Sequence, residues 1–147
     1  MIHIHLYQSA DETPLLTIFR KNVPAAFGES EVADYADFLR VNPDPYFVAE
    51  HNGQLVGACG CGVKEDGITG RIAWIFTDPD FAGVGVGSAL VRHCLGELRA
   101  NPAVTLIECR TSQVAYRFFE HLGFVLQRTE LDYWVPGFDL YVMTLKP

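Results

Sequence analysis

The chain has 147 residues, of which 49% are hydrophobic and 20% are charged, and its formal net charge is −7. This composition is ordinary for one globular domain over residues 1–147 and excludes a disordered chain. The acidic balance argues against a nucleic-acid-binding protein, which needs a basic face, and every apolar run is far shorter than the roughly 20 residues that span a bilayer.

The first third of the chain predicts one strand followed by two helices. Apolar and polar residues alternate over residues 2–7, which is typical of a half-buried strand. Ser9 or Asp11 can cap a first helix. A second helix is expected after Ser30, and Asn42-Pro43 ends it because the residue before a proline disfavours helical backbone.

The middle of the chain predicts a three-stranded antiparallel meander. The stretch YFVAE is a strand, and Asn52-Gly53 after it is the strongest short hairpin signal that a sequence offers. The stretch LVGACGCGV forms the returning strand. A turn at Asp66-Gly67 then leads into a third strand over residues 71–77.

A glycine cluster follows this meander, in the stretch DPDFAGVGVGSALV of residues 78–91. Glycine loses more conformational freedom on folding than any other residue, so the cluster needs a physical reason. A loop of bare amides at a helix N-terminus offers unpaired N–H groups and the positive end of the helix dipole, which suits a phosphate group. We call residues 82–88 the glycine loop; a tight turn without a ligand is its structural alternative.

The remaining residues predict two helices and three strands. A helix is expected over residues 86–99, a strand over 103–109, a helix over 112–123, and two last strands around Pro136-Gly137. The element order is therefore β-α-α-β-β-β-α-β-α-β-β.

This order and two motifs resemble the GNAT superfamily of acetyl-CoA-dependent N-acyltransferases. The first family motif is a strand, a proline, Arg/Gln-x-x-Gly-x-Gly/Ala and a helix. The second is Asn-x-x-Ala-x-x-Phe-Tyr-x-x-x-Gly-Phe. The stretches IFTDPDFAGVGVGSALV and SQVAYRFFEHLGF match these motifs at Pro79, Gly85, Gly87, Ala115, Phe118, Gly123 and Phe124.

The resemblance implies a fold, a reaction and a cofactor. The expected fold is α+β, in α/β/α layers, with a mixed, mostly antiparallel sheet of six to seven strands and four helices. The expected reaction is the attack of a neutral amine on the thioester of acetyl-CoA, which acts as co-substrate, and we expect no metal.

The resemblance also implies where the cofactor binds. The glycine loop would hold the pyrophosphate, and backbone groups of the strand before it would bond the pantetheine arm where the fourth and fifth strands splay apart. Ala82 stands where the family usually has Arg or Gln, so we expect the amides to supply most of the affinity. The expected cofactor-binding residues are Phe76, Thr77, Ala82, Gly83, Val84, Gly85, Val86, Gly87, Ser88, Ser112, Phe118 and Phe119.

Glu108 is the candidate general base. Val104, Leu106 and Glu108 share one face of the predicted strand, and the first two are apolar. A carboxylate at the end of such a row would be partly desolvated and suited to accept a proton. The structural alternative is that Glu108 pairs with Arg110 or Arg71, or faces water.

Tyr116 is the candidate general acid, because Phe119 occupies the position of the tyrosine that often has this role in the family. The two residues lie about one helical turn apart and should point the same way. Packing is the structural alternative for Tyr116, and Tyr133 is a rival acid. Cys109 is a further candidate, as a covalent nucleophile, but direct transfer is the usual route of the family.

The acceptor is expected to be a small-molecule or peptide amine, and the acidic balance suits a cationic one. The first two helices and the loop at residues 130–137 would shape an aromatic-lined acceptor site. Two alternatives remain, a catalytically impaired acyl-CoA-binding module of the same fold and a dinucleotide-binding oxidoreductase. A homodimer through sheet edges is also considered. The expected aromatic residues of the acceptor site are Phe19, Phe27, Tyr35, Tyr133 and Trp134.

The cysteines and the N-terminus predict the compartment. The four cysteines fall on predicted strands and a helix, and Cys59 and Cys61 lack the two-residue spacing of a zinc or redox motif. The N-terminal stretch MIHIHLYQSADE has neither a basic start nor a long apolar centre, so we expect no signal peptide. Reduced, mostly buried thiols in a cytoplasmic protein without a membrane partner are the expectation.

Overall fold

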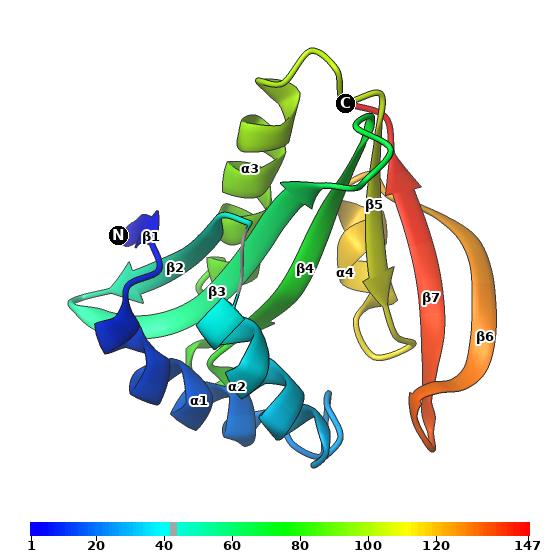
Figure 1. Cartoon of the computed structure of the whole chain (residues 1–147). Helices are drawn as coiled ribbons and strands as arrows, with labels where there is room; N and C mark the ends of the chain where they lie inside the picture. The colour runs from blue at the N-terminus through cyan, green and yellow to red at the C-terminus, as the bar shows by residue number, and fades with distance from the viewer. Residues whose placement is uncertain (42–43) are drawn as a thin grey trace.

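The computed structural model describes residues 1–41 and 44–147 and contains the predicted elements in the predicted order (Figure 1). The predicted end of the second helix at Asn42-Pro43 lies outside the described residues. The elements are β1 (Ile2–Leu6), the 3-10 turn η1 (Ser9–Asp11), α1 (Glu12–Lys21), α2 (Glu31–Val41), β2 (Tyr46–His51), β3 (Gln54–Val63), β4 (Thr69–Thr77), the 3-10 turn η2 (Pro79–Phe81), α3 (Val86–Arg99), β5 (Leu106–Thr111), α4 (Tyr116–His121), β6 (Val125–Val135) and β7 (Phe138–Leu145).

A sheet of seven strands in the order β1-β2-β3-β4-β5-β7-β6 forms the middle layer. Among the described residues, β4 and β5 are the one parallel pair, and all other neighbouring strands run antiparallel. Helices α1 and α2 cover one face, and α3 and α4 cover the other (Figure 1). The predicted α+β class is therefore confirmed. The doubly wound parallel sheet that a dinucleotide-binding oxidoreductase needs is absent from the described part of the chain.

The predicted meander is formed by β2, β3 and β4, and its first turn has the backbone that its residues favour. Asn52 and Gly53 both have positive φ, 52° and 78°. This is the conformation of a two-residue hairpin turn that matches the twist of its strands, and asparagine followed by glycine adopts it at low cost.

The two central strands, β4 and β5, pair over only part of their length. Residues 69–72 of β4 pair with residues 106–109 of β5, and beyond this point the strands diverge (Figure 1). A bulge in β4 causes the divergence. Ala58 of β3 pairs with Phe76 and Gly60 pairs with Ala73, so β4 has one extra residue between these pairs, and Trp74 within this stretch has a φ of 51°. Past Ile72 and Cys109, the facing edges therefore leave alternate backbone N–H and C=O groups without a partner strand.

The fifth strand begins later than predicted. The amide of Val104 donates to the carbonyl of Asn101, and the amide of Ala103 donates to Asn101 Oδ1, so a turn occupies the expected start. Val104 instead packs in the core under α3 and does not share a face with Glu108. The predicted row of three residues on one face is therefore wrong, and only Leu106 keeps the expected relation to Glu108.

Helix α4 is shorter than predicted because residues 113–115 form a turn. Ser112 starts this turn, since its hydroxyl accepts a hydrogen bond from the amide of Val114 at 3.2 Å. The predicted stop at Gly123 is confirmed. Its φ is 99°, and the amides of Gly123 and Phe124 donate to the carbonyls of Glu120 and Phe119, which is the Schellman pattern of a helix C-terminus.

An aromatic core fills the space between the sheet and the two N-terminal helices. Phe19 and Tyr35 are fully buried and stack with ring centroids 4.7 Å apart. Phe76 meets both rings edge-on, at 5.3 and 5.1 Å. Phe19 and Tyr35 therefore belong to the core and not to the surface of an acceptor site, which corrects the expectation for these two residues.

The four cysteines form no disulfide. All four cysteines are free and buried, as predicted. Among residues 1–41 and 44–147, no helix has the length and apolarity needed to cross a bilayer.

Candidate active site

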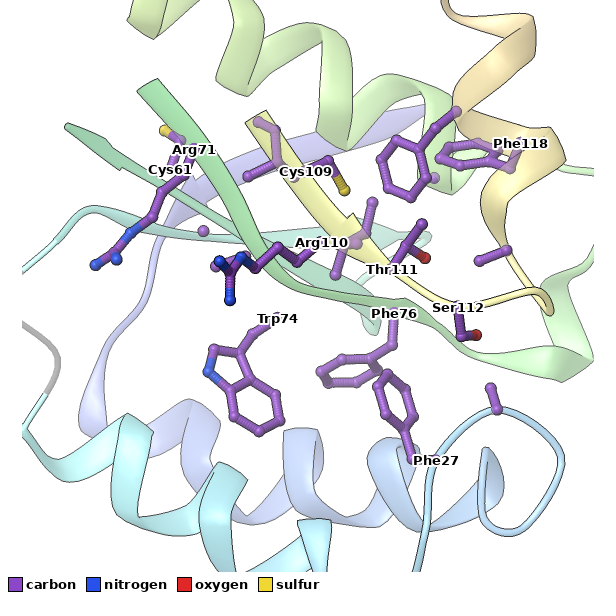
Figure 2. Close-up of a pocket in the computed structure, with 18 of the residues that line it drawn as sticks. Phe27, Cys61, Arg71, Trp74, Phe76, Cys109, Arg110, Thr111, Ser112 and Phe118 are labelled. Atoms are coloured by element: carbon purple, nitrogen blue, oxygen red, sulfur yellow. The ribbon is translucent and has the colours of Figure 1, made fainter. Parts of the chain in front are cut away.

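A cavity of about 770 Å³ lies where β4 and β5 diverge. Residues 71–77 of β4 and 108–111 of β5 form its two long walls. Gly87 at the start of α3 lines one end, and Phe27 in the α1–α2 connection lines the opposite side. Figure 2 shows side chains of both strands around this space, and the cavity extends from Gly87 to the face of the sheet that α1 and α2 cover.

The glycine loop has the backbone that a phosphate site needs. Gly83 and Gly85 have φ of 84° and 88°, and a Cβ added to either would meet nothing within 4 Å. Glycine is thus required at these two positions by the backbone conformation and not by crowding. Gly87 has a different reason, because a Cβ there would lie 3.2 Å from the Phe118 ring.

The loop leaves a defined set of amides available. The amides of Ala82 and Val84 donate to the carbonyls of Pro79 and Phe81, both at 3.3 Å, so these two expected donors are already occupied. Five further loop amides have no acceptor among the described residues, and they surround the N-terminus of α3. They belong to Gly83, Gly85, Val86, Gly87 and Ser88.

The other expected cofactor residues lie beside this loop. Phe76, Thr77, Ser112, Phe118 and Phe119 all line the cavity. Ser112 uses its hydroxyl to hold the α4 turn, and Phe119 is buried against Phe118 with ring centroids 5.0 Å apart.

Asn22, a residue not singled out from the sequence, holds the end of β4. Its side-chain amide donates to the carbonyl of Thr77 at 3.0 Å and to the carbonyl of Ile18 at 3.1 Å. Asn22 also lines the cavity. The last strand residue before the glycine loop is therefore fixed by the C-terminus of α1.

Glu108 lines the cavity in a paired state. Its side chain is 17% exposed, and its Oε1 atom lies 3.4 Å from both Lys64 Nζ and Arg110 Nε. Arg71 pairs instead with Asp44 at 2.9 Å. The pairing with Arg110 was anticipated, whereas the contact with Lys64 was not.

Glu31 is a second carboxylate in the cavity and was missed from the sequence. It is the first residue of α2, is 8% exposed, and accepts a hydrogen bond from the Gly28 amide at 3.3 Å. Burial raises the pKa of Glu31 above its ordinary value. An acidic residue at a helix start looks like an ordinary favourable charge for the helix dipole, so its sequence position carried no signal of a site.

The candidate acids, Tyr116 and Tyr133, and the candidate nucleophile, Cys109, differ in their position relative to the cavity. Tyr116 is not among the cavity-lining residues, because its ring packs on Tyr141 at 4.8 Å between centroids. The hydroxyl of Tyr133 accepts a hydrogen bond from Arg110 Nη1 at 3.3 Å. Cys109 lines the cavity, but burial raises the pKa of its thiol, which disfavours the thiolate that a nucleophile requires.

Two segments far apart in the sequence meet beside the cavity. Trp134, which lines it, donates from Nε1 to the carbonyl of Thr111 at 3.1 Å. The next residue, Val135, lies so close to Gly28 that a Cβ on Gly28 would be 2.7 Å from Val135 Cγ1. The β6–β7 hairpin and the α1–α2 connection therefore touch across one side of the site.

The sequence model described as the acetyltransferase (GNAT) family matches residues 13–124. The chain belongs to the GNAT acetyltransferase family. The resemblance expected from the two motifs is thus confirmed. The glycine loop and the second motif, SQVAYRFFEHLGF, both lie within the matched region.

Individual relatives of this GNAT protein agree with the family. An N-acetyltransferase of Methanocaldococcus jannaschii is 34% identical over 93 residues, which are 58% of this chain and 41% of that protein. This chain therefore spans about two fifths of that relative's length.

Solved structures support the fold. A structure described as a GNAT-family acetyltransferase of Desulfovibrio desulfuricans superposes with a TM-score of 0.84 at 17% identity and covers 99% of each chain. An acetyltransferase of Salmonella typhimurium, solved with acetyl-CoA, gives a TM-score of 0.78 at 20% identity over 99% of this chain and 94% of that one. At these identities the likeness concerns the fold alone.

Proposed function

We propose that this GNAT protein transfers an acetyl group from acetyl-CoA to the primary amine of a small acceptor, with both molecules bound at once. One observation carries the proposal: a single cavity extends from Gly87, one of the glycine-loop residues with an unpaired amide, to two carboxylates, Glu31 and Glu108. Acetyl-CoA would supply the activated acetyl thioester.

The residues present fit the phosphate groups of this co-substrate. Five unpaired amides and the N-terminal end of the α3 dipole supply positive potential without a cationic side chain at Ala82. The unpaired edge of β4 near Phe76 and Thr77 can then hydrogen-bond the amide-containing arm and orient the carbonyl to be attacked.

Glu31 is the residue that we propose to take the proton. An alkylammonium is protonated at pH 7, so its attack on a thioester requires that a proton leave the nitrogen. A carboxylate whose pKa is raised by burial accepts a proton more readily than an ordinary one. Glu108, which already contacts Lys64 and Arg110, is proposed to hold the acceptor in place.

The nitrogen then bonds to the acetyl carbon, the carbon–sulfur bond breaks, and the electron pair leaves with the sulfur. The attacking nitrogen loses its second proton to water, and the thiolate takes a proton from that water or from Tyr133, which regains it from the water; the Tyr133 hydroxyl contacts the cavity-lining Arg110. Tyr116 packs on Tyr141 outside the cavity, so its hydroxyl is not proposed as the acid.

A small acceptor is favoured over a folded protein by the contact between Gly28 and Val135. This contact restricts one side of the cavity to molecules that can enter beside it. A homodimer stays a prediction; β6 is an edge strand whose residues 125–134 are all exposed, and it would be the first surface to examine.

The test is thiol release from acetyl-CoA with a library of small amines, together with mass detection of the acetylated product. Release that depends on an amine supports the proposal. Binding of acetyl-CoA by calorimetry with no amine-dependent release would instead support a catalytically impaired acyl-CoA-binding module. No binding at all would contradict both functions.

A further inference from the structure

The wall of the cavity carries a guanidinium that acetyl transfer as proposed does not require. Arg110 directly follows Cys109, the last residue of β5 that pairs with β4, and its side chain is 43% exposed. Figure 2 shows Arg110 on the side of the sheet where Trp74 and Phe76 lie, facing α1 and α2. Arg110 therefore stands where the strands begin to diverge.

The hydrogen-bonding capacity of Arg110 is largely unused. A guanidinium has five N–H donors in a planar fork. Nε lies 3.4 Å from Glu108 and Nη1 lies 3.3 Å from the Tyr133 hydroxyl, while Nη2 has no acceptor in the described part of the chain. Lys64 contacts the same oxygen of Glu108. The single negative charge of Glu108 is therefore shared between two cations and does not fully balance the charge of Arg110.

We propose that the acceptor is an amino acid or a close analogue, and that Arg110 binds its carboxylate. This inference rests on the proposed acetyl transfer. The planar fork of a guanidinium matches a carboxylate through two parallel hydrogen bonds. Lys64 and Arg71, which also line the cavity, contact Glu108 and Asp44, so one added negative charge would face Arg110, which favours a carboxylate over a doubly charged phosphate.

The position of Arg110 also limits the distance between the two groups of the acceptor. It follows the last β4–β5 pair, Ile72 and Cys109, and the unpaired edge of β4 that we propose for the thioester begins at the same level. An amine that reaches the thioester carbonyl while its carboxylate contacts Arg110 has the two groups only a few bonds apart. An α-amino or β-amino acid has this spacing.

The remaining walls indicate the kind of side chain. Phe27, Trp74 and Trp134 line the cavity. Trp134 already donates its Nε1–H to the Thr111 carbonyl, so its ring presents an apolar surface. Apolar walls with a few fixed polar groups are typical of small-ligand sites, so we infer an apolar or aromatic amino acid.

The experiment compares amino acids with the amines that lack only the carboxylate. L-phenylalanine and phenethylamine, L-tyrosine and tyramine, and L-leucine and isoamylamine form the pairs, and 2-aminoethyl phosphate tests a dianion. Thiol release gives kcat and KM for the wild type, for Arg110→Gln, and for Arg128→Gln, which removes the same charge from exposed β6 outside the cavity.

We expect the wild type to prefer the amino acid of a pair by about 10-fold or more in kcat/KM. Arg110→Gln should raise KM for amino acids about 10- to 100-fold and change KM for the simple amines by less than about 3-fold. Arg128→Gln should change neither. A fall in kcat for both members of a pair would indicate a merely structural role for Arg110.

Three results would overturn the inference while leaving acetyl transfer intact. These are equal turnover of both members of a pair by the wild type, an equal loss on both in Arg110→Gln, and preference for 2-aminoethyl phosphate. If no compound releases thiol, the proposed function fails and the melting temperature of the CoA-bound protein decides the inference. A rise with L-phenylalanine in the wild type but not in Arg110→Gln supports carboxylate binding, and no rise contradicts it.

Discussion

The Nζ atom of Lys21 lies 3.0 Å from Oδ2 of Asp78, a carboxylate that is only 1% exposed. The same ammonium lies 3.0 Å from Asp80, and its hydrogen bonds to Asp78 and Asp80 raise the pKa of Lys21. Asp78 also accepts a hydrogen bond from the Asp80 amide at 3.0 Å, and its own amide donates to Val56 at 2.7 Å. The C-terminus of α1 thus fixes the segment that leads from β4 into the glycine loop.

Removal of the Asp78 carboxylate should weaken both the fold and cofactor binding. We expect Asp78→Ala to lower the free energy of unfolding by about 1–3 kcal/mol, because several hydrogen bonds at a buried site are lost. The KM for acetyl-CoA should rise as the loop loses its anchor. Asp80→Ala is the control: Asp80 is 73% exposed, and surface ion pairs contribute about 0–1 kcal/mol. Urea unfolding and steady-state kinetics measure both, and equal effects of the two variants would contradict this role.

Gly85 and Gly53 offer a matched pair for the glycine loop. Both have positive φ, 88° and 78°, and a Cβ at either position meets nothing within 4 Å. Alanine at each should cost about 1–2 kcal/mol of stability through backbone strain. Only Gly85→Ala should also weaken acetyl-CoA binding, because only this strain shifts the amides at the start of α3. Calorimetry measures the affinities, and a similar loss with Gly53→Ala would show that the effect is not local.

Glu31→Gln should separate activity from stability. Loss of the proton acceptor should lower kcat about 10²- to 10³-fold. Since the pKa of Glu31 is raised in the folded protein, its protonated form is favoured there, and stability falls as pH rises through that pKa. A neutral glutamine avoids this loss, so the variant should be more stable than the wild type at pH 7, and the difference should shrink toward pH 4.

The wild-type rate should also fall as pH decreases through the raised pKa of Glu31, because only the deprotonated carboxylate accepts a proton. Rate profiles against pH and urea unfolding at two pH values provide the measurements. A wild-type kcat in Glu31→Gln would exclude Glu31 as the base and would leave Glu108 as the candidate.

The contact between Gly28 and Val135 should control access to the acceptor side. Gly28→Ala places a Cβ 2.7 Å from Val135 Cγ1, which pushes the β6–β7 hairpin away and costs about 1–3 kcal/mol. The KM for the acceptor should rise while the affinity for acetyl-CoA stays the same. Val135→Ala in the same chain should restore much of the loss; if it does not, the contact is not what sets the acceptor KM.

Much of the fold could be predicted because local signals agreed with the global arrangement. Asn52-Gly53 forms the expected turn, Gly123 ends α4, and the helix after the glycine loop spans Val86–Arg99 as predicted. The late start of β5 was missed because Asn101 forms a turn through its own side chain. Such competition between side chain and backbone is weakly visible in a single sequence.

The candidate site was less accessible to prediction for a physical reason. The glycine loop is contiguous, so its role could be read from one stretch. Glu31, Asn22 and Lys64 reach the cavity only through tertiary packing, and neither periodicity nor charge marks them. Phe19 and Tyr35 were assigned to the acceptor site by their aromatic character, whereas packing between α1, α2 and the sheet buries them completely.

The central claim is that acetyl-CoA binds with its phosphates against the bare amides of the glycine loop and its thioester between β4 and β5. The most direct measurement is titration of ¹⁵N-labelled protein with acetyl-CoA, followed by amide chemical shifts. We predict the largest changes at Gly83, Gly85, Gly87 and Ser88, with further changes at Phe76. Changes concentrated outside the glycine loop and β4, or no changes at all, would contradict the account.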